Sequence, residues 1–327
     1  MRLGLAMRSL TVGTALIALA GALVACGESG SSSSQQGAKC PAATGEQLVV
    51  LQDDKHLQTV DNVIPAINKN AATAALTQAL DKVGAALTTD KLVALNRQVD
   101  VERQTPARAA ETFVNDNGLA QGVSGGSGKV TVGGQNFSEG KILANIYVTV
   151  LKAAGFDAEF KAVGNRELYL RDLGSGAVDV MPEYVGTLTE FLNKQQNGAN
   201  APAKASGDLD QTVTALRDLG TKANLVFGTP AQAADQNAFA VTKAFADANG
   251  LVTLSDLASK CAGANIVLGG PTECQERPFC KPGLEQTYGL KFSSFVTLDA
   301  AGPLTKTAIR QGRVQIGLVL SSDGGLG

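Results

Sequence analysis

The clearest alternation of apolar and polar positions lies in the stretch FSEGKILANIYVTVLKAAGF, residues 137–156. Its apolar residues recur at intervals of three and four, which is typical of an amphipathic helix. Ser138 is placed to cap the start of this helix, and Phe137 to staple onto Ile142. Strand-like sequences, KVTVGG before the helix and DAEFKAV after it, predict a strand–helix–strand unit and therefore a parallel sheet.

The same order of elements recurs further along the chain. A helix around Glu167–Leu173 precedes the strand-like AVDVMPEY (177–184). The stretch LTKTAIRQGRVQIGLVL (304–320) again predicts a helix, a glycine and a buried strand. Two such units, well separated in the sequence, indicate an α/β protein with two similarly built lobes.

Residues 46–119 have a different, mostly helical pattern. The short run QLVVL predicts a strand, two helical patterns follow it, and Thr105 with Pro106 is a typical start for a third helix. The Gly/Ser-rich segment 120–128 then predicts a flexible linker. On this pattern alone, an N-terminal helical domain precedes the α/β domain.

Residues 1–25 predict an export signal peptide. Arg2 and Arg8 precede an uncharged stretch that is short for a membrane span. The stretch ends in Leu-Val-Ala followed by Cys26, which resembles the lipobox of bacterial lipoproteins. The resemblance implies that a lipid on Cys26 anchors the exported chain on the outer face of the cytoplasmic membrane. An ordinary cleaved signal is the alternative. Residues 26–45 would be a flexible tether.

The charge balance excludes one class of partner. Removal of Arg2 and Arg8 with the signal peptide leaves 26 of the 28 basic residues against 30 acidic ones, a net charge of about −4. With no basic patch in the sequence, we expect no binding to nucleic acid.

The cysteines predict two disulfides. An even number in an exported chain is typical of paired cysteines, and four allow three pairings. Cys274 and Cys280 are close in sequence, so we expect them to form one pair and Cys40 with Cys261 the other. Zinc is the competing interpretation, but the sequence has no CxxC and its one histidine is His56, so no metal site is expected.

From Val130 onward the chain resembles the substrate-binding proteins of ABC importers for glycine betaine, choline and related quaternary amines. The matching stretches are VGGQNFSEGKIL (132–143), VDVMPEYVGTL (178–188), LSDLA (254–258), ERPFCKPGLEQTYGL (276–290) and SSD (321–323). The resemblance implies an α/β, two-lobed periplasmic-binding-protein fold of type II, with the ligand held between lobes that close by a hinge.

Three further stretches of that family are present here but lie ahead of the rest instead of behind it: LVVLQDDKHLQ (48–58), ALTTDKLVALNRQVD (86–100) and TPARAAETFVNDNGL (105–119). We therefore interpret the chain as circularly permuted, with the ancestral termini joined by 120–128. Termini that lie close together at a surface make such a permutation tolerable. This interpretation predicts that residues 47–51 lie beside the end of 314–320 and complete a sheet with 129–134.

The resemblance also implies a domain plan. Lobe 1 would comprise residues 46–119 and 129–228, and lobe 2 residues 229–320. Residues 321–327 would cross back between the lobes and form the new C-terminus.

A quaternary ammonium group has no proton to donate and is held by aromatic faces in a dry cage. By resemblance, Tyr184 is a cage residue, and Thr187 and Arg277 meet the carboxylate of the ligand. The alternatives are a packed tyrosine below the cleft, a helix cap, and a salt bridge from Arg277 to Glu276 or Glu285.

Three other positions depart from the family, because Ala238, Leu320 and Lys306 stand where its cage tyrosines are expected. Phe137, Tyr169 and Phe239 are possible substitutes, and a larger or more polar solute is the alternative ligand. The candidate ligand-binding residues are Asn136, Phe137, Arg166, Tyr184, Thr187, Gln236, Asn237, Arg277, Ser321, Ser322 and Asp323.

The sequence has no GxSxG, HExxH or Walker motif, and His56 lies in a charged turn, so neither an enzyme nor a cofactor is expected. The implied partners are a small solute, the permease and ATPase subunits of an importer, and the membrane through Cys26. We expect a monomer. A surface interaction protein without a transport role is the remaining alternative.

Overall fold

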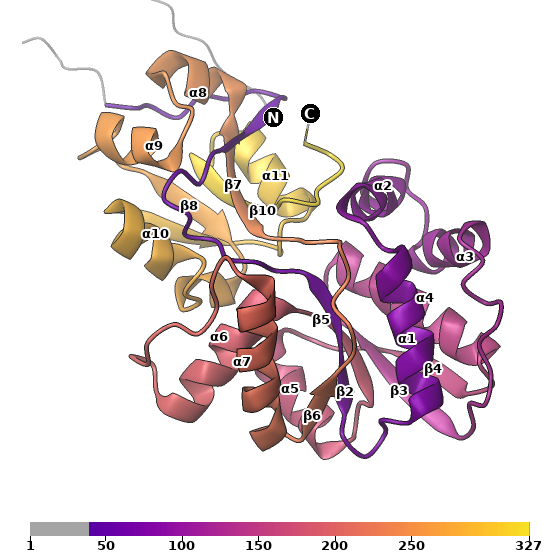
Figure 1. Cartoon of the computed structure of the whole chain (residues 1–327). Coiled ribbons are helices and arrows are strands. Elements are labelled where there is room, and N and C mark those ends of the chain that lie inside the picture. The colour runs from indigo at the N-terminus through magenta and orange to yellow at the C-terminus, as the bar shows by residue number, and fades with distance from the viewer. Residues whose placement is uncertain (1–38, 327) are drawn as a thin grey trace, which may run out of the picture. The chain divides into compact units, whose positions relative to one another are not determined.

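Two five-stranded sheets organise residues 39–326, the part of the chain that the computed structural model describes (Figure 1). The strands are β1 (Leu48–Leu51), β2 (Val63–Asn68), β3 (Lys129–Gly134), β4 (Asp157–Ala162), β5 (Val180–Tyr184), β6 (Leu225–Phe227), β7 (Asn237–Thr242), β8 (Val267–Gly270), β9 (Ser294–Thr297) and β10 (Ile316–Leu320). The helices are α1 (Ala74–Ala86), α2 (Thr89–Asp100), α3 (Pro106–Asp116), α4 (Ser138–Ala153), α5 (Arg166–Ser175), α6 (Val185–Asn197), α7 (Leu209–Lys222), α8 (Lys243–Asn249), α9 (Leu254–Lys260), α10 (Lys281–Tyr288), α11 (Pro303–Arg310) and the 3₁₀ turn η1 (Thr272–Gln275).

Lobe 1 is built on the sheet with strand order β4-β3-β5-β2-β6. β3 runs parallel to both β4 and β5, as the strand–helix–strand pattern predicts. β2 is buried on both faces because successive side chains of a strand point in opposite directions. Val63 and Ile67 pack into the core beneath α1 to α4, whereas Ile64 and Ala66 pack into the core beneath α5 to α7.

Lobe 2 has the strand order β1-β7-β10-β8-β9. Alternation again divides its core. Phe239 and Val241 of β7 pack with residues of α8, α9 and α10, while Ala240 between them packs with Ala308 and Ile309 of α11. Each lobe is therefore a sheet covered by helices on both faces, which is the expected α/β class.

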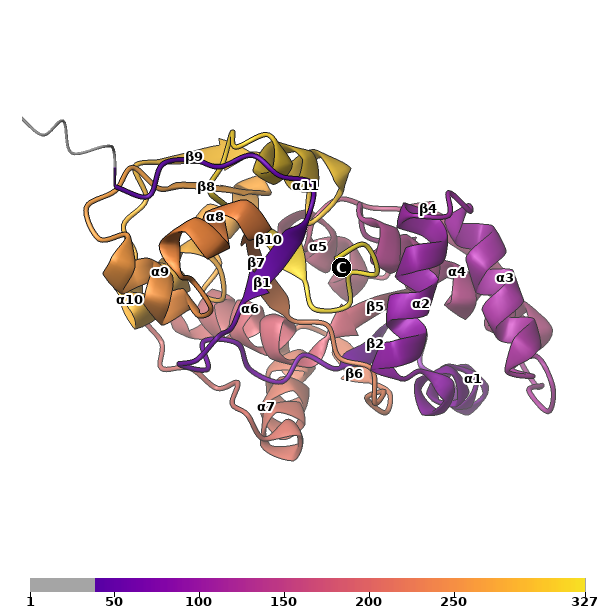
Figure 2. The ribbon, with the colours of Figure 1, turned by 90° about the horizontal axis from the view of Figure 1, so that it is seen from above.

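The predicted place of β1 is wrong. β1 pairs antiparallel with β7, and β7 separates it from β10, so β1 belongs to the sheet of lobe 2 and makes no sheet with β3 (Figure 2). The cause is its side chains, since Leu51 enters one core of lobe 2 and Leu48 the other. Lobe 1 begins only at β2 and extends beyond residue 228, because Ala231 and Ala233 pack into its core.

The helices that precede the linker in the sequence do not form a separate domain. The interpretation of residues 46–119 as an N-terminal helical domain is therefore wrong. Leu80 of α1, Leu92 of α2 and Phe113 of α3 are buried in the same core as the apolar stripe of α4.

The predicted cap of α4 is also wrong. Ser138 is already helical, and its hydroxyl donates a hydrogen bond to Asp100 at the end of α2 (2.6 Å).

Three segments connect the lobes: 52–62 between β1 and β2, 228–236 between β6 and β7, and 321–326 after β10. Gln236 ties all three together. Its backbone N–H donates to the hydroxyl of Ser321 (2.8 Å), and its carbonyl accepts from the N–H of Ser321 (2.9 Å). Its side-chain amide donates to a backbone carbonyl of the first segment. The crossings therefore run as a hydrogen-bonded bundle, not as independent linkers.

The predicted signal peptide (1–25) and the predicted lipidation site Cys26 lie outside the described residues. The predicted tether is wrong for its last part, because residues 40–45 are fixed to lobe 2. Thr242 donates to the carbonyl of Ala43 (2.8 Å), and the N–H of Gly45 donates to the carbonyl of Arg310 (3.0 Å). None of the helices between residues 39 and 326 is long and apolar enough to cross a bilayer.

The predicted disulfide pairing is confirmed. Cys40 and Cys261 are bonded with a Cα–Cα distance of 5.6 Å, and Cys274 and Cys280 with 5.2 Å. All four are buried. The bridges differ in span, since the first joins residues 221 positions apart and the second residues six positions apart.

We expect the long bridge to contribute more to stability, because a disulfide acts mainly by restricting the unfolded chain and its effect grows with loop length. The Cys40→Ser/Cys261→Ser double variant should lose about 4–5 kcal/mol of unfolding free energy, and Cys274→Ser/Cys280→Ser about 2 kcal/mol. Urea unfolding without reductant measures both. Equal losses would contradict the expectation.

Candidate functional site

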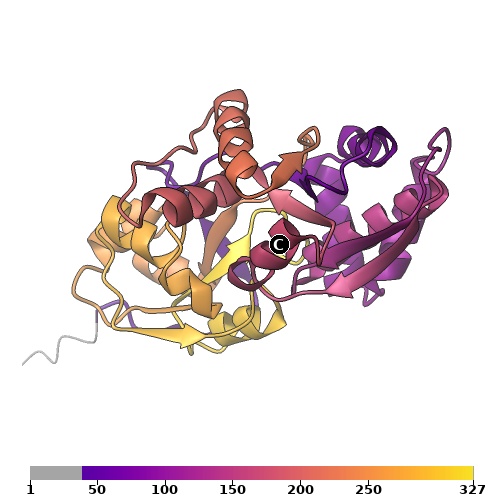
Figure 3. The same ribbon diagram turned by 90° about the horizontal axis from the view of Figure 1, so that it is seen from below.

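A cavity of about 620 Å³ lies between the two lobes, which are seen side by side in Figure 3. Lobe 1 contributes the turn between β3 and α4, the start of α5 and residues along α6 from Thr187 to Gln195. Lobe 2 contributes the start of β7, the segment from η1 to α10, the segment between β9 and α11, and the end of β10. The cavity thus adjoins strand ends of both sheets, where open α/β sheets bind ligands.

Four aromatic residues line the cavity: Phe137, Tyr184 and Phe191 from lobe 1 and Phe279 from lobe 2. The rings of Phe137 and Tyr184 are 6.4 Å apart between centroids, with 34° between their planes. Aromatic faces attract a desolvated cation through the ring quadrupole. The lining can therefore hold an ammonium group from two sides.

The charged residues of the lining are mostly acidic. The five acidic residues are Glu167, Asp235, Glu273, Glu276 and Asp299, and the three basic ones are Arg166, Lys194 and Arg277. Both arginines are paired with carboxylates, so the cavity favours a cation over an anion.

Arg166 is buried, and its guanidinium is already occupied. It donates to both carboxylate oxygens of Glu183 (3.0 and 2.6 Å) and to the hydroxyl of Thr187 (3.0 Å). Although burial opposes its charge, the carboxylate of Glu183 raises the pKa of Arg166 above its usual value. The ion pair therefore has a structural role, and it leaves no free pair of guanidinium N–H groups to bind a ligand carboxylate.

Thr187 acts as part of a helix cap. The carboxylate of Asp61, from the first crossing segment, accepts hydrogen bonds from the N–H groups of Gly186 (2.8 Å) and Thr187 (3.0 Å) at the start of α6. Burial raises the pKa of Asp61 to about 7, against the opposing effect of these donors and of Arg166. The crossing segment is thereby fixed to α6.

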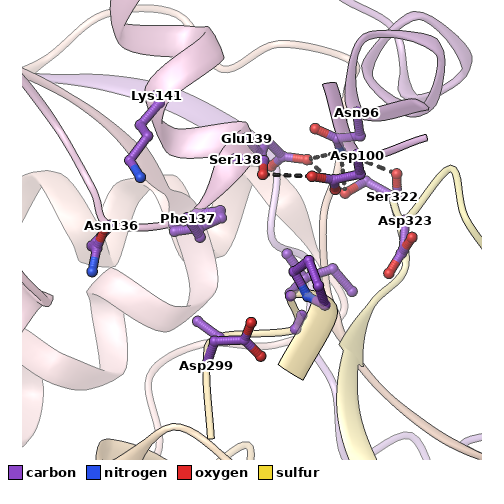
Figure 4. A pocket seen from close by; sticks show the side chains of 15 residues that line it. Asn96, Asp100, Asn136, Phe137, Ser138, Glu139, Lys141, Asp299, Ser322 and Asp323 are labelled. Carbon is purple, nitrogen blue, oxygen red and sulfur yellow. Dashed lines mark hydrogen bonds between the residues drawn. The ribbon is translucent and has the colours of Figure 1, made fainter. Parts of the chain in front are cut away.

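Tyr184 turns its ring to the cavity and its hydroxyl away from it. The hydroxyl donates to Glu139 (2.6 Å), the second residue of α4. The other oxygen of Glu139 accepts from Ser322 Oγ (2.6 Å) and from Asn96 Nδ2 (2.6 Å), and Figure 4 shows these three residues joined. Asp235 accepts from the N–H of Ser322 (3.0 Å). We call these five residues the junction network.

Two carboxyl groups of the junction network titrate together. Burial raises the pKa of Glu139, and burial together with the negative charge of Glu139 raises the pKa of Asp235 well above its usual value. Two nearby buried carboxylates cannot both ionise cheaply. Folding therefore disfavours the ionised forms of both carboxyl groups.

A second, smaller cavity of about 200 Å³ adjoins the first one at Asn136 and Phe137. Ser322 and Asp323 line it together with residues of α2 and α4, and Figure 4 shows Asp299 on the side away from the junction network. Asp323 forms a buried ion pair with Lys306 (2.8 Å). Lys306, at one of the expected tyrosine positions, therefore fixes the last crossing segment.

The structure brings most of the predicted residues together. Those that line the main cavity are Asn136, Phe137, Arg166, Tyr184, Thr187, Asn237 and Arg277. Gln236 and Ser321 line neither cavity and instead join the crossing segments.

Tyr169 and Phe239 are wrong as substitutes for the missing cage. Both are buried within the cores of their lobes, and the hydroxyl of Tyr169 donates to Glu183. Neither Glu276 nor Glu285 pairs with Arg277, whose carboxylate partners are Glu167 across the cleft (2.9 Å) and Glu273 (3.8 Å).

Sequence reasoning missed Phe191, Phe279 and the partners of Tyr184. Phe191 lies one helical turn after Thr187, so the period of α6 was a usable signal. Phe279 lies inside the matched stretch ERPFCKPGL, but its direction depends on the loop. Asn96 and Ser322 are 226 positions apart, and no local pattern indicates their contact.

No group of three or more histidine, cysteine, aspartate or glutamate side chains in the described part of the chain is arranged to hold a metal ion.

The comparisons with known proteins agree on one class. The family model described as the substrate-binding domain of an ABC-type glycine betaine transport system matches residues 41–116 and 128–327. The glycine betaine-binding protein YehZ of Escherichia coli (strain K12) is 30% identical over 184 residues. That alignment covers 55% of this chain and spans only 58% of the relative's length.

Two solved structures are also similar. A glycine betaine/carnitine/choline ABC transporter structure shares 19% identity with a TM-score of 0.38 and covers 60% of this chain and 70% of its own. Haemophilus influenzae OppA in complex with the peptide RPPGFSPFR shares 12% identity with a TM-score of 0.28, covering 57% and 45%.

The raised pKa of Asp235 makes stability depend on pH. The folded pKa of Asp235 is raised above its unfolded value of 3.8, so above about pH 4 the folded state binds more protons than the unfolded state. The free energy of unfolding therefore falls as pH rises, by about 1.4 kcal/mol for each pH unit at a one-proton difference.

Asp235→Asn should make this fall less steep above pH 4, since an amide oxygen still accepts from Ser322. Part of the fall remains in the variant because the pKa of Asp61 is raised to about 7. Urea unfolding across that range measures the slope. Asp247→Asn, on an exposed part of α8, is the matched control. A slope in Asp235→Asn as steep as in the control would show that folding does not raise the pKa of Asp235.

Proposed function

Because the chain belongs to the family of substrate-binding domains of ABC-type glycine betaine transport systems, we propose that it binds a small quaternary amine and delivers it to an ABC importer. The family consists of solute-binding proteins and not of enzymes. The proposed role is extracytoplasmic. Delivery to a permease and its ATPase subunits, and a lipid anchor on Cys26, are parts of this proposal.

The observation that carries the choice of solute is the aromatic and acidic lining of the main cavity. Three rings of lobe 1 and the ring of Phe279 surround a space of about 620 Å³, within the usual range for small-molecule sites. A trimethylammonium group needs such faces and gains nothing from hydrogen-bond acceptors. The excess of carboxylates further favours a cation.

A carboxylate on the same solute has few free partners here. Arg166 is held by Glu183, and Arg277 by Glu167. Lys194 on α6 is the basic residue of the lining that has no ion pair among the described residues. The arrangement favours a solute whose positive end dominates its recognition.

A more polar solute is the second candidate. The amide side chains of Gln135, Asn136, Asn165, Gln195 and Asn237 line the same cavity. Such groups orient sugars and amino acids by hydrogen bonds. This candidate keeps the transport role and changes the cargo.

Circular permutation of the chain is part of the proposal. It is supported by the two separate stretches of the family match, which leave the Gly/Ser-rich linker unmatched. It is also supported by the ends of the fold, since Leu326 and Leu48 pack in one small apolar cluster. A short connection between them would restore the order of elements expected for the family.

Reversal of the permutation gives a direct test. A variant that begins near residue 128, joins residue 326 to residue 39 through a few glycines and ends near residue 119 keeps both disulfides. It should fold as stably as the original within about 1–2 kcal/mol. Urea unfolding measures the difference. A rejoined chain that stays unfolded, beside a folded original, would contradict the proposed permutation.

Ligand-dependent stabilisation tests the function itself. The chain from Lys39 onward is unfolded thermally with glycine betaine, choline, carnitine, proline betaine, amino acids and sugars. A solute at ~100 times its Kd should add about 2.7 kcal/mol and raise Tm by several degrees. A shift with the trimethylammonium compounds supports the proposal. A shift only with amino acids or sugars supports the second candidate, and no shift with any solute favours the interaction protein.

Phe191→Ala should weaken binding of a quaternary amine about tenfold, because it removes one face of the lining. Phe160→Ala is the matched control, since Phe160 lies on β4 outside the cavity and is 38% exposed. Isothermal titration calorimetry measures both affinities. Equal affinities for the two variants would exclude Phe191 as a ligand contact.

A further inference from the structure

The disulfide Cys274–Cys280 closes a seven-residue ring between η1 and the start of α10. Both sulfurs belong to buried residues, whereas the residues between them face the cleft. Glu276, Arg277 and Phe279 of this ring line the main cavity. Lobe 2 thus presents a covalently closed loop, and not a strand or helix end alone, to the ligand site.

The ring is held from outside by two amides. The carbonyl of Phe279 accepts from Asn237 Nδ2 (3.0 Å), at the start of β7, and from Gln58 Nε2 (3.0 Å), in the first crossing segment. The carbonyl of Phe279 is therefore hydrogen-bonded both to the sheet of lobe 2 and to the first crossing segment. The side chain attached to it, Phe279, has little freedom to leave the cavity.

The far side of the ring lies against α10 at very short range. A Cβ added to Gly283 would lie 2.1 Å from the carbonyl oxygen of Pro278. Only glycine permits this approach, because any side chain there would push the ring away from α10. Glycine at this position therefore fixes where the ring sits.

The ring also reaches the opposite lobe. Arg277 donates to both oxygens of Glu167 (3.1 and 2.9 Å), the second residue of α5. Although burial raises the pKa of Glu167, the bonds from Arg277 lower it below its usual value. Because two hydrogen bonds hold this ion pair, it resists separation of the lobes more strongly than a single hydrogen bond would.

We propose that the Cys274–Cys280 ring is the specificity and closing element of lobe 2. Its Phe279 forms the aromatic wall that faces the rings of lobe 1, where Ala238, Leu320 and Lys306 supply none. Its Arg277 holds Glu167 and keeps the lobes together. The disulfide is a positioning element for both side chains. The role of Phe279 as an aromatic wall depends on the proposed function, whereas the role of Arg277 in keeping the lobes together does not.

The competing explanation is that this disulfide only stabilises lobe 2. The two bridges of the chain separate these explanations, because both are buried and only one encloses cavity residues. Opening the Cys40–Cys261 bridge should lower stability and leave the ring intact. Opening Cys274–Cys280 should affect the cleft more than stability.

The closing role is tested without ligand. Small-angle X-ray scattering compares the wild-type chain from Lys39 with Cys274→Ser/Cys280→Ser, Cys40→Ser/Cys261→Ser, Arg277→Gln and Glu167→Gln. We expect the lobes to lie further apart in Cys274→Ser/Cys280→Ser, Arg277→Gln and Glu167→Gln. Cys40→Ser/Cys261→Ser should keep the dimensions of the wild type. In the Arg277→Gln/Glu167→Gln double variant the lobes should lie no further apart than in either single variant, because both changes remove the same pair. Unchanged dimensions in all of them would overturn the closing role.

The aromatic wall is tested by calorimetric titration with glycine betaine and choline. Opening the ring and Phe279→Ala should each weaken the tighter of the two at least tenfold, while Cys40→Ser/Cys261→Ser retains the wild-type Kd. Phe279→Ala keeps the disulfide and decides the matter if the ring-opened variant fails to fold, as circular dichroism would reveal. A wild-type Kd in Phe279→Ala overturns the wall. Absence of binding by the wild type contradicts the proposed function and leaves the scattering result to decide the closing role.

Discussion

The arrangement of both lobes depends on one buried hydrogen-bond network. Glu139, at the start of α4, binds Tyr184 of β5, Asn96 of α2 and Ser322 after β10, and Ser322 binds Asp235 between β6 and β7. Each of these residues is buried, so removing one partner would leave another polar group without water or a bond. Five segments that are far apart in the sequence therefore meet at one buried network.

The two walls of the cavity are prepared by different means. In lobe 1, the junction network turns the ring of Tyr184 to the cleft, and Asp61 with Arg166 fixes the start of α6. In lobe 2, a covalent ring with two amide contacts does the same for Phe279. Sites supported in this way lose little freedom when a ligand arrives.

The sequence predicted local elements well, because apolar periodicity determines them. The stripe of α4, the parallel strands beside it and the cysteine pairs were all predicted. Periodicity does not say which sheet receives a four-residue strand, so β1 was placed in the wrong lobe. It also hides β2, whose Pro65 is unusual for a strand that lies between two others. The junction network and the direction of Phe279 depend on contacts between remote residues, which no local pattern contains.

The bond between Cys40 and Cys261 has a mechanical consequence. Any force that acts through the residues before Lys39 enters the fold at Cys40 and passes through the bridge to the end of α9. The hydrogen bonds between β1 and β7 lie beyond this point and are not loaded, so the edge strand cannot be peeled away one residue at a time. Lobe 2 therefore carries the attachment point of the N-terminal residues, and lobe 1 is reached from it through the crossing segments and the Arg277–Glu167 pair.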